Sequence, residues 1–468
     1  MIETIVDTLN GFLWGSVLIY LLVFCGLWFT FKLAAIQFRH FPHMFSVMKH
    51  SRSTDKHGIS SFQALCTTLA ARVGTGNLMG VAVAISLGGP GAVFWMWVIA
   101  IIGMATAYAE STLGQLYKIE DENGHYRGGP AFYMQYGLNN KPMAVLFSIC
   151  LLLGYGLVFS PVQANSITDA FNGSYGIDPI YSGMVLTVLT GIIVLGGLKK
   201  IASFAELVVP FMGLAYVLVA LAVIAINITE VPAALANIVS SAFGLREAGS
   251  GMVGAAIMNG VKRGLYSNEA GMGSAPNAAA AATPYPNHPA SQGYVQMLGV
   301  FVDTIVLCTC TALIILLSGI PLGQEFGIKL TQQALENQVG FWGGDFITLA
   351  IFFFAFTSMV ANFAYAENSL SFLKLDNKIG RGCFITLFLA MIFFGSFASL
   401  GRLIAMADLA VALMTIVNVI AIIMLTKALI RVSKDYNKHI DEGEEPNFKV
   451  SQQEAKSMRL RPGIWSDK

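Results

Sequence analysis

Long apolar runs separated by short loops are the feature that most constrains how this chain can fold. About 20 apolar residues are enough to cross the hydrocarbon core of a bilayer as a helix. The 468-residue chain is 55% hydrophobic and only 12% charged, whereas a soluble domain usually carries about 25% charged residues. The chain is therefore predicted to be an all-α polytopic membrane protein. About eleven transmembrane helices are expected, at residues 11–31, 61–86, 91–117, 143–172, 179–197, 201–227, 236–261, 292–318, 341–373, 379–398 and 403–430.

Lysine and arginine are concentrated in alternate loops, and this sets the expected orientation. Basic residues follow the first, third, fifth, seventh and ninth spans and fill the segment after Arg431, whereas the intervening loops hold only Lys329 and Arg402. Short basic loops stay on the cytoplasmic side of a membrane. We therefore expect the N-terminus outside and the C-terminus in the cytoplasm, with the charged tail of residues 431–468 lying loose at the surface.

One apolar span contains a sequence that a helix tolerates poorly. In residues 71–85, ARVGTGNLMGVAVAI, two glycines and an asparagine lie near the middle, and these are poor helix formers. A helix broken inside a membrane survives only where protein or water satisfies its freed backbone groups. Free N–H groups at the start of a half-helix attract a carboxylate, and free carbonyls attract a cation. The stretch is therefore predicted to bind an anionic group and a cation together, with close helix packing as the simpler alternative.

A second span, 236–261, is also interrupted by glycines. It contains Phe243-Gly244, with Arg246 and Glu247 after it, and these two charges mark either a functional site or a loop at the membrane edge. The interrupted spans head two sets of five, and paired interrupted helices indicate an inverted-repeat transporter. The expected organisation is an extra helix and basic loop (1–60), two inverted five-helix repeats (61–227 and 228–430) and a cytoplasmic tail (431–468).

Four stretches of the sequence together resemble one family of transporters. They are 73-VGTGN-77, 88-GGPGAVFWMWVIAIIG-103, 260-GVKRGLYSNEAGMGSAPNAAAA-281 and 292-QGYVQMLGVFVDT-304. With them the chain resembles the alanine/glycine:cation symporter family, the sodium:alanine symporters of bacteria and archaea. The resemblance implies a LeuT-like fold with a 5+5 inverted repeat and one extra N-terminal helix, in the plasma (inner) membrane of a prokaryote. It also implies sodium-driven import of a small neutral amino acid.

The resemblance also assigns a substrate site to the first break, which is similar to the equivalent break of LeuT-like transporters. The N–H groups of Thr75, Gly76 and Asn77 are expected to hold the substrate carboxylate, with the Thr75 hydroxyl as a further donor. Gln163, in the unusually polar fourth span, is expected to face the substrate. The alternatives are that Thr75 only caps the second half-helix and that Gln163 bonds a neighbouring helix.

The second break is expected at Phe243 and Gly244, on the basis of position. The Phe243 ring would close over the substrate side chain and limit its size, although a core aromatic is the usual alternative for any phenylalanine. Residues 267–271, SNEAG, follow Lys262 and Arg263. They are therefore expected in a gate or loop at the cytoplasmic face, away from the substrate.

The ninth span offers ligands for a cation. Thr357 and Ser358 are adjacent hydroxyls in an otherwise apolar run, in the helix where LeuT-like transporters place a sodium ion. Together with the carbonyls of Ala70, Val73 and Phe354 they are the expected sodium ligands. The alternative is that both hydroxyls bond carbonyls of their own helix.

Arg72 directly precedes the first break and needs a partner if it is buried. Charged residues inside a membrane are usually paired or functional. Glu110, Glu269 and Asp303 are the candidate partners, and the sequence does not choose among them.

These features predict a sodium-coupled symporter that imports alanine or glycine by alternating access and tolerates D-alanine. A glutamine or serine carrier of the same fold and a proton-coupled carrier remain open; sodium is favoured because the expected ion site contains no carboxylate. A channel is disfavoured because no pore-forming repeat is present, and an enzyme because no catalytic arrangement lies within the spans. Sodium is the coupling ion expected, and the partners are an amino acid and the lipid bilayer, with no nucleic acid.

Overall fold

The computed structural model describes residues 2–122, 124–245, 250–322 and 327–466, and it confirms a helical membrane protein. Eight continuous helices in this part of the chain are long and apolar enough to cross a membrane. They match eight of the expected spans. With η marking a π-helical stretch, they comprise α1 (Ile2–Phe12), η1 (Leu13–Leu18) and α2 (Ile19–Lys32); α7 (Gly91–Leu116); α9 (Lys141–Leu153), η4 (Gly154–Phe159) and α10 (Ser160–Tyr175); α12 (Gly197–Ile226); α16 (Pro289–Val300), η5 (Phe301–Cys308) and α17 (Thr309–Leu317); α19 (Trp342–Phe372); α20 (Lys378–Gly395); and α21 (Leu400–Met424).

The first interrupted span is a bent pair of helices, as the sequence predicts. Helix α5 (Ser61–Arg72) is followed by η2 (Gly76–Gly80) and α6 (Val81–Gly88), and the two parts meet at 49°. Ser60 and Gln63 form a capping box that starts α5, because each side chain bonds the backbone N–H of the other. The break divides the span into two half-helices with free ends inside the protein.

The second interrupted span begins later than expected. Helix α13 (Val231–Ala242) ends before a turn in which Gly244 has a φ of +66°, and α14 (Ser250–Asn268) starts a separate helix. The expectation of one interrupted span over 236–261 with its break at Phe243-Gly244 is therefore wrong, and Arg246 and Glu247 lie outside the described residues. The interruption falls at residues 269–274, between α14 and α15 (Ala275–Ala281).

Backbone geometry explains why the chain breaks at residues 269–274. Glu269, Gly271 and Gly273 all have positive φ, at 57°, 91° and 79°. Glycine adopts this conformation at little cost, whereas a helix cannot continue through it. The SNEAGMG sequence therefore encodes a break rather than a surface loop.

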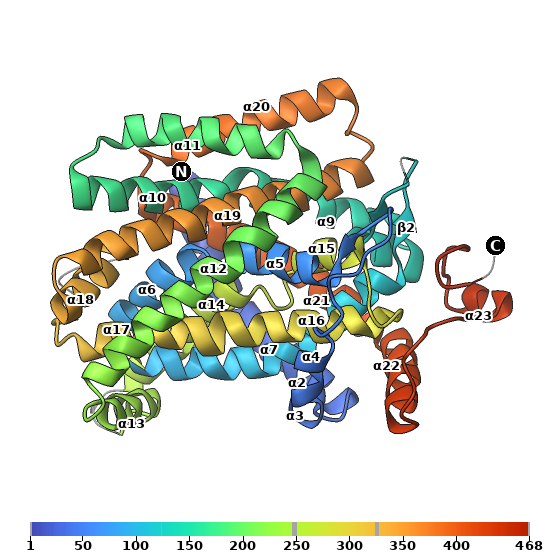
Figure 1. Ribbon diagram of the computed structural model, residues 1–468, viewed down its shortest axis with the longest axis horizontal. Helices are drawn as coiled ribbons and strands as arrows, with labels where there is room; N and C mark the ends of the chain where they lie inside the picture. The colour runs from blue at the N-terminus through green and yellow to red at the C-terminus, as the bar shows by residue number, and fades with distance from the viewer. Residues whose placement is uncertain (1, 123, 246–249, 323–326, 467–468) are drawn as a thin grey trace.

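Helix α11 (Pro179–Val194), at the expected span 179–197, is a shorter apolar helix that runs along the bundle beside α10 and α20 (Figure 1). The other remaining elements are short and lie mainly at the ends of the bundle. One end carries segments 33–58, 117–129 and 425–466, which together hold 14 of the 28 lysines and arginines and ten acidic residues, and we call it the basic face. Figure 1 shows β2 (Ile119–Glu120), α22 (Thr426–Asp441) and α23 (Gln452–Ser457) at this end and α13 and α18 (Ile328–Val339) at the other. The elements are α3 (Ile36–Arg39), α4 (Phe41–Ser46), β1 (Ile59–Ser60), β2 (Ile119–Glu120), β3 (Tyr126–Arg127), α8 (Pro130–Phe132), η3 (Tyr133–Gly137), β4 (Ala282–Thr283), α18 (Ile328–Val339), α22 (Thr426–Asp441) and α23 (Gln452–Ser457).

A pair of two-residue parallel strands connects the interrupted spans at the basic face. Strand β1 directly precedes α5, strand β4 directly follows α15, and the two pair in parallel with Ile59 opposite Ala282. Strands β2 and β3 form a separate antiparallel hairpin. The β1–β4 pair therefore joins one half of the first broken span to one half of the second.

The C-terminal tail is docked on the basic face, so the expectation of a loose tail is wrong. Trp465 is 2% exposed, and its Nε1 donates to the Gln115 carbonyl at 3.2 Å. The Tyr117 hydroxyl donates to the Met458 carbonyl, and the Phe448 ring packs against Trp465. The tail is rich in charged residues, and its composition did not indicate that these few aromatic residues are buried.

We predict that Trp465→Ala releases the tail from the basic face. Removing a buried aromatic side chain costs about 3 kcal/mol or more, which is about a hundredfold in the equilibrium for local opening. Hydrogen–deuterium exchange of residues 448–466 should therefore become much faster. Lys449→Ala changes an exposed residue of the same segment and should leave the exchange unaltered; equal exchange in both variants would contradict the docked tail.

Candidate substrate and ion site

The two helix breaks lie against each other in the centre of the protein. A Cβ atom added at Gly76, in the first break, would lie 3.1 Å from the Cα of Ser267 at the end of α14. Ser267, Asn268 and Glu269 are all buried. The sequence SNEAG therefore forms part of the central site, and its expected place in a loop at the cytoplasmic face is wrong.

Side chains satisfy the backbone groups freed at the first break. The Gly74 N–H donates to Asn77 Oδ1 at 3.1 Å, and the Thr75 N–H donates to Gln163 Oε1 at 3.0 Å. The N–H groups of Gly76 and Asn77 lie in the first turn of η2, where no carbonyl of the same helix is available to them. Gln163 thus reaches the break from α10, where it bonds the backbone.

The Thr75 hydroxyl forms no hydrogen bond with any of the described residues. Thr75 precedes η2, yet its hydroxyl makes no capping bond, and Oγ1 is a buried oxygen without a hydrogen-bond partner. A simple capping role therefore does not account for this residue. The hydroxyl is available to a ligand.

Glu110 supplies hydrogen-bond acceptors for the backbone groups freed at the second break. This buried residue of α7 accepts hydrogen bonds from the N–H groups of Gly271 at 3.2 Å and Gly273 at 3.1 Å. Asn418 of α21 donates to the same carboxylate and to the Gly271 carbonyl. Glu110 therefore holds the irregular segment in place, a role that its position in an apolar helix does not reveal.

Asp303 connects the two breaks. It lies in η5 and is fully buried, with one carboxylate oxygen accepting from Asn77 Nδ2 at 2.8 Å and the other from Ser267 Oγ at 2.8 Å. Asn77 lies in η2, directly after the first break, and Ser267 lies at the end of α14, directly before the second. The sequence contains no local signal for this bridge, because its three members are distant along the chain.

Arg72 is buried next to these carboxylates without forming an ion pair. Its Nη1 donates to Gln296 Oε1 at 3.1 Å, whereas Nε and Nη2 have no hydrogen-bond partner in the described part of the chain. Among the described ion pairs none joins Arg72 to Glu110, Glu269 or Asp303. The guanidinium therefore retains two free donors in the protein interior.

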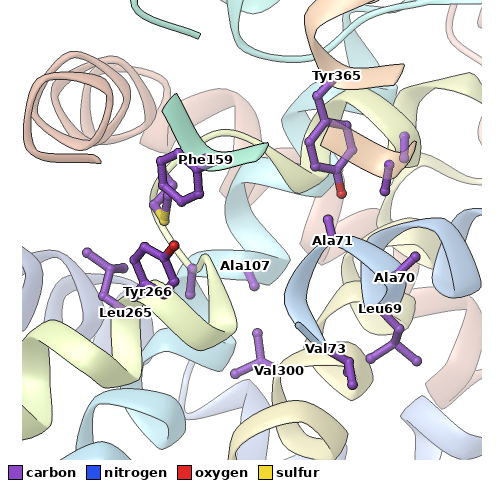
Figure 2. Packing of buried hydrophobic residues seen from close by; sticks show 14 of the residues in the cluster. Leu69, Ala70, Ala71, Val73, Ala107, Phe159, Leu265, Tyr266, Val300 and Tyr365 are labelled. Carbon is purple, nitrogen blue, oxygen red and sulfur yellow. The ribbon is translucent and has the colours of Figure 1, made fainter. Parts of the chain in front are cut away.

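Other polar groups near the breaks also lack partners. Buried polar atoms are nearly always hydrogen-bonded, so a group of unpartnered ones suggests a site for a polar ligand. Rings of Tyr155 and Phe159 stack at 4.7 Å, and Phe159 stacks on Tyr266 at 5.2 Å. Figure 2 shows Phe159 facing Tyr266, and Tyr365 above Ala71. The unpartnered side-chain atoms here include Thr75 Oγ1, Asn268 Nδ2 and the hydroxyls of Tyr155, Tyr266 and Tyr365.

Oxygen atoms from α5 and α19 converge beside the first break. Ser358 Oγ lies 2.7 Å from the Ala70 carbonyl and 3.0 Å from the Phe354 carbonyl, and Thr357 Oγ1 lies 3.0 Å from the same Phe354 oxygen. Both hydroxyls therefore bond their own helix, but Ser358 also reaches across to α5. Val73 ends α5, and its N–H donates to the Leu69 carbonyl. Carbonyl and hydroxyl oxygens of this kind suit a hard cation.

Phe243 and Gly244 are not part of this centre. Phe243 is 51% exposed at the end of α13, where its ring packs against Phe94 at 5.1 Å. The Gly244 turn ends α13, as a glycine with positive φ commonly does after a helix. Their assignment to the second break is wrong, because the sequence pattern does not distinguish a helix-ending glycine from an intramembrane break.

Comparison with known proteins identifies the family. The model of the sodium:alanine symporter family matches residues 1–450. The chain belongs to the sodium:alanine symporter family. It is 46% identical to the "Probable sodium/glutamine symporter GlnT" of Bacillus subtilis, over 96% of this chain and 93% of the relative. It is 38% identical to the "Sodium/alanine symporter AgcS" of Methanococcus maripaludis, over 93% of this chain and 97% of the relative.

The fold is shared with a solved transporter of different sequence. A crystal structure of MhsT in complex with L-phenylalanine superposes with a TM-score of 0.60 at 17% identity, covering 79% of this chain and 90% of MhsT. The predicted LeuT-like fold is thereby confirmed. The chain is a multi-pass membrane protein that transports amino acids, and it is not an enzyme.

We predict that Gly74→Ala destabilises the centre whereas Gly80→Ala does not. A Cβ atom at Gly74 would collide with Ser358 Oγ and lie 2.9 Å from Gln163 Oε1, but at Gly80 the nearest atom is 3.7 Å away. Overpacking of this kind costs about 1–3 kcal/mol. The melting temperature in detergent should fall for Gly74→Ala alone, and equal values for both variants would contradict the tight contact.

Proposed function

We propose that this protein is a sodium-coupled symporter that imports a small neutral amino acid, alanine or glycine, by alternating access. The observation that carries the proposal is the position of the oxygen cluster around Ser358 directly beside the unpartnered groups of the first break. Ala70, in the cluster, and Thr75, in the break, are five residues apart. A cation bound to the cluster would fix the half-helix end that receives the substrate.

The polar groups of the first break suit the main-chain atoms of an amino acid. The N–H groups of Gly76 and Asn77 and the Thr75 hydroxyl would hold the substrate carboxylate, close to a half-helix N-terminus that favours negative charge. Gln163 would contact the substrate while it orients the Thr75 N–H. Contacts with the backbone and with small groups do not depend strongly on chirality, so D-alanine would also be accepted.

The side-chain end of the pocket would be small. Tyr155, Phe159 and Tyr266 form a continuous aromatic stack next to the break. A substrate side chain that lies against this stack would be limited to a hydrogen atom or a methyl group. Tyr266, which follows the GVKRGL sequence of α14, takes the size-limiting role that the sequence assigned to Phe243.

Sodium would occupy the cluster formed by Ala70, Val73, Phe354, Thr357 and Ser358. The described ligands are carbonyls and hydroxyls, and the nearby carboxylate of Asp303 is occupied by Asn77 and Ser267. A cluster of neutral oxygens has no proton to exchange near neutral pH, which favours sodium over proton coupling. The ion would be the coupling solute and not a permanent cofactor.

The basic face would be cytoplasmic, with the N-terminus outside, since basic loops are retained in the cytoplasm. Residues 61–227 and 228–430 would form the two inverted repeats, headed by the broken helices. Rocking of one group of helices against the other would then expose the site to each side in turn. The plasma membrane of a prokaryote is the proposed location.

Glutamine is the second candidate substrate. The relative named as a probable sodium/glutamine symporter is 46% identical to this chain, compared with 38% for the relative named as a sodium/alanine symporter. A glutamine carrier would use the same backbone contacts and the same ion. It would require a larger space next to the aromatic stack.

Uptake by the purified protein in liposomes tests the function. We expect labelled alanine to accumulate with an inward sodium gradient and not when potassium replaces sodium. Excess glycine and D-alanine should block this uptake, and excess glutamine should not. Blockade by glutamine alone would favour the second candidate, whereas uptake driven equally by a proton gradient without sodium would overturn sodium coupling.

We predict that Thr357→Ala and Ser358→Ala each raise the sodium concentration needed for half-maximal uptake. One oxygen ligand contributes about 1–1.5 kcal/mol to sodium binding, so its loss should raise this sodium concentration roughly tenfold. Ser371→Ala removes a hydroxyl from the same helix, α19, more than three turns from the cluster, and should leave the sodium dependence unchanged. Unchanged sodium dependence in both ligand variants would remove the proposed ion site.

A further inference from the structure

A cavity at the basic face lies outside the substrate and ion site. It has a volume of about 700 Å³ and lies between α4, the segment 47–53, α5 and α16. Its inner wall is apolar, formed by Phe45, Met48, Leu65 and Leu298 among others. The cavity is therefore lined from both a loop at the end of the bundle and two membrane-spanning helices.

The rim of the cavity is basic, and the described residues that line it include no acidic one. Lys49, His50 and Arg52 line it together with two serines. Lys49 and Arg52 are exposed, and the described ion pairs include neither of them. The Arg52 guanidinium lies over the Phe62 ring at 4.9 Å, which holds it at the entrance. Two unneutralised cations at the mouth of an apolar cavity favour an amphipathic anion.

The cavity extends from the end of the bundle, where its basic rim lies, into the apolar part of the membrane-spanning helices. Its basic rim lies just before the start of α5, whereas Leu298 is nine residues into α16, about 14 Å along that helix. Phe38 and Phe45, on α3 and α4, are 62% and 47% exposed, as expected for residues that face lipid. The cavity is thus placed to receive a headgroup at the surface and a chain within the apolar region.

We propose that this cavity binds an anionic phospholipid. Its phosphate would lie between Lys49 and Arg52, and one acyl chain would extend along Phe45, Met48 and Leu298. Basic pockets between transmembrane helices are suited to acidic lipid headgroups. A soluble phosphate would leave the apolar wall exposed to water, and a zwitterionic lipid would leave the two cations without a net counter-charge.

The bound lipid would contact the first broken span. Phe62 and Leu65 line the cavity, and both belong to α5, the half-helix that ends at the first break. A lipid chain against α5 would stabilise its position relative to α16. The binding proposal itself does not depend on which amino acid or coupling ion the protein uses.

Photolabelling with a lipid probe tests the proposal. The full-length protein in mixed lipid–detergent micelles is exposed to a photoactivatable phosphatidylglycerol, and labelled peptides are mapped. We expect label between residues 45 and 65 at subsaturating probe. K49Q/R52Q should lower it about thirtyfold, because each basic residue near an acidic lipid contributes about 1 kcal/mol.

Two further variants separate the parts of the site. K427Q/K434Q removes the same charge from two exposed lysines of α22, so labelling between residues 45 and 65 should remain as in the unaltered protein. M48W keeps both cations but fills the apolar part of the cavity, so labelling there should fall. Melting temperatures of all variants show whether each one is folded.

Other outcomes would overturn the proposal. Equal loss of label in K49Q/R52Q and K427Q/K434Q would mean a general surface charge effect. Equal labelling by a phosphatidylcholine probe would mean an unselective apolar groove. Competition by millimolar glycerol phosphate as effective as that by phosphatidylglycerol would mean a site for a soluble phosphate.

Discussion

The backbone groups freed at two helix breaks are the constraint on which the rest of this structure depends. In an apolar environment an unpaired N–H or carbonyl group costs several kcal/mol, so each break requires side-chain partners. Gln163 of α10 and Asn77 of the broken span itself supply them at the first break, and Glu110 of α7 and Asn418 of α21 supply them at the second. Polar residues inside an otherwise apolar bundle are thus placed where the backbone needs them.

The two breaks are also joined to each other. Asp303 links Asn77 to Ser267 in the centre, and the β1–β4 pair links the same two spans at the basic face. Hydrogen bonds to a buried carboxylate are strong because the surrounding dielectric is low. The half-helices of the two broken spans are therefore directly connected at both places.

The polar groups that remain unpartnered define where ligands are expected. Thr75, Asn268 and three tyrosines have buried polar atoms without partners, and these lie where the broken helices meet the aromatic stack. The Ser358 cluster is next to them and is already rich in oxygen. The proposed centre for substrate and ion rests on the position of both sets of groups at one half-helix end.

The sequence by itself determined the class of the protein. Apolar runs of membrane length, the VGTGN interruption and the hydroxyl pair at Thr357 and Ser358 are local signals, since each depends on residues that are adjacent in the chain. The apolar runs predicted the membrane helices, and the VGTGN interruption predicted the first break. The family motifs predicted the LeuT-like fold.

Only the tertiary structure decided how distant segments meet. The second break is at residues 269–274 and not at Phe243, because the backbone there adopts positive φ and Glu110 of another helix stabilises it. The docking of Trp465 against Gln115 joins residues 350 positions apart. Such contacts depend on which helices become neighbours after folding, and hydropathy along a single chain does not contain that information.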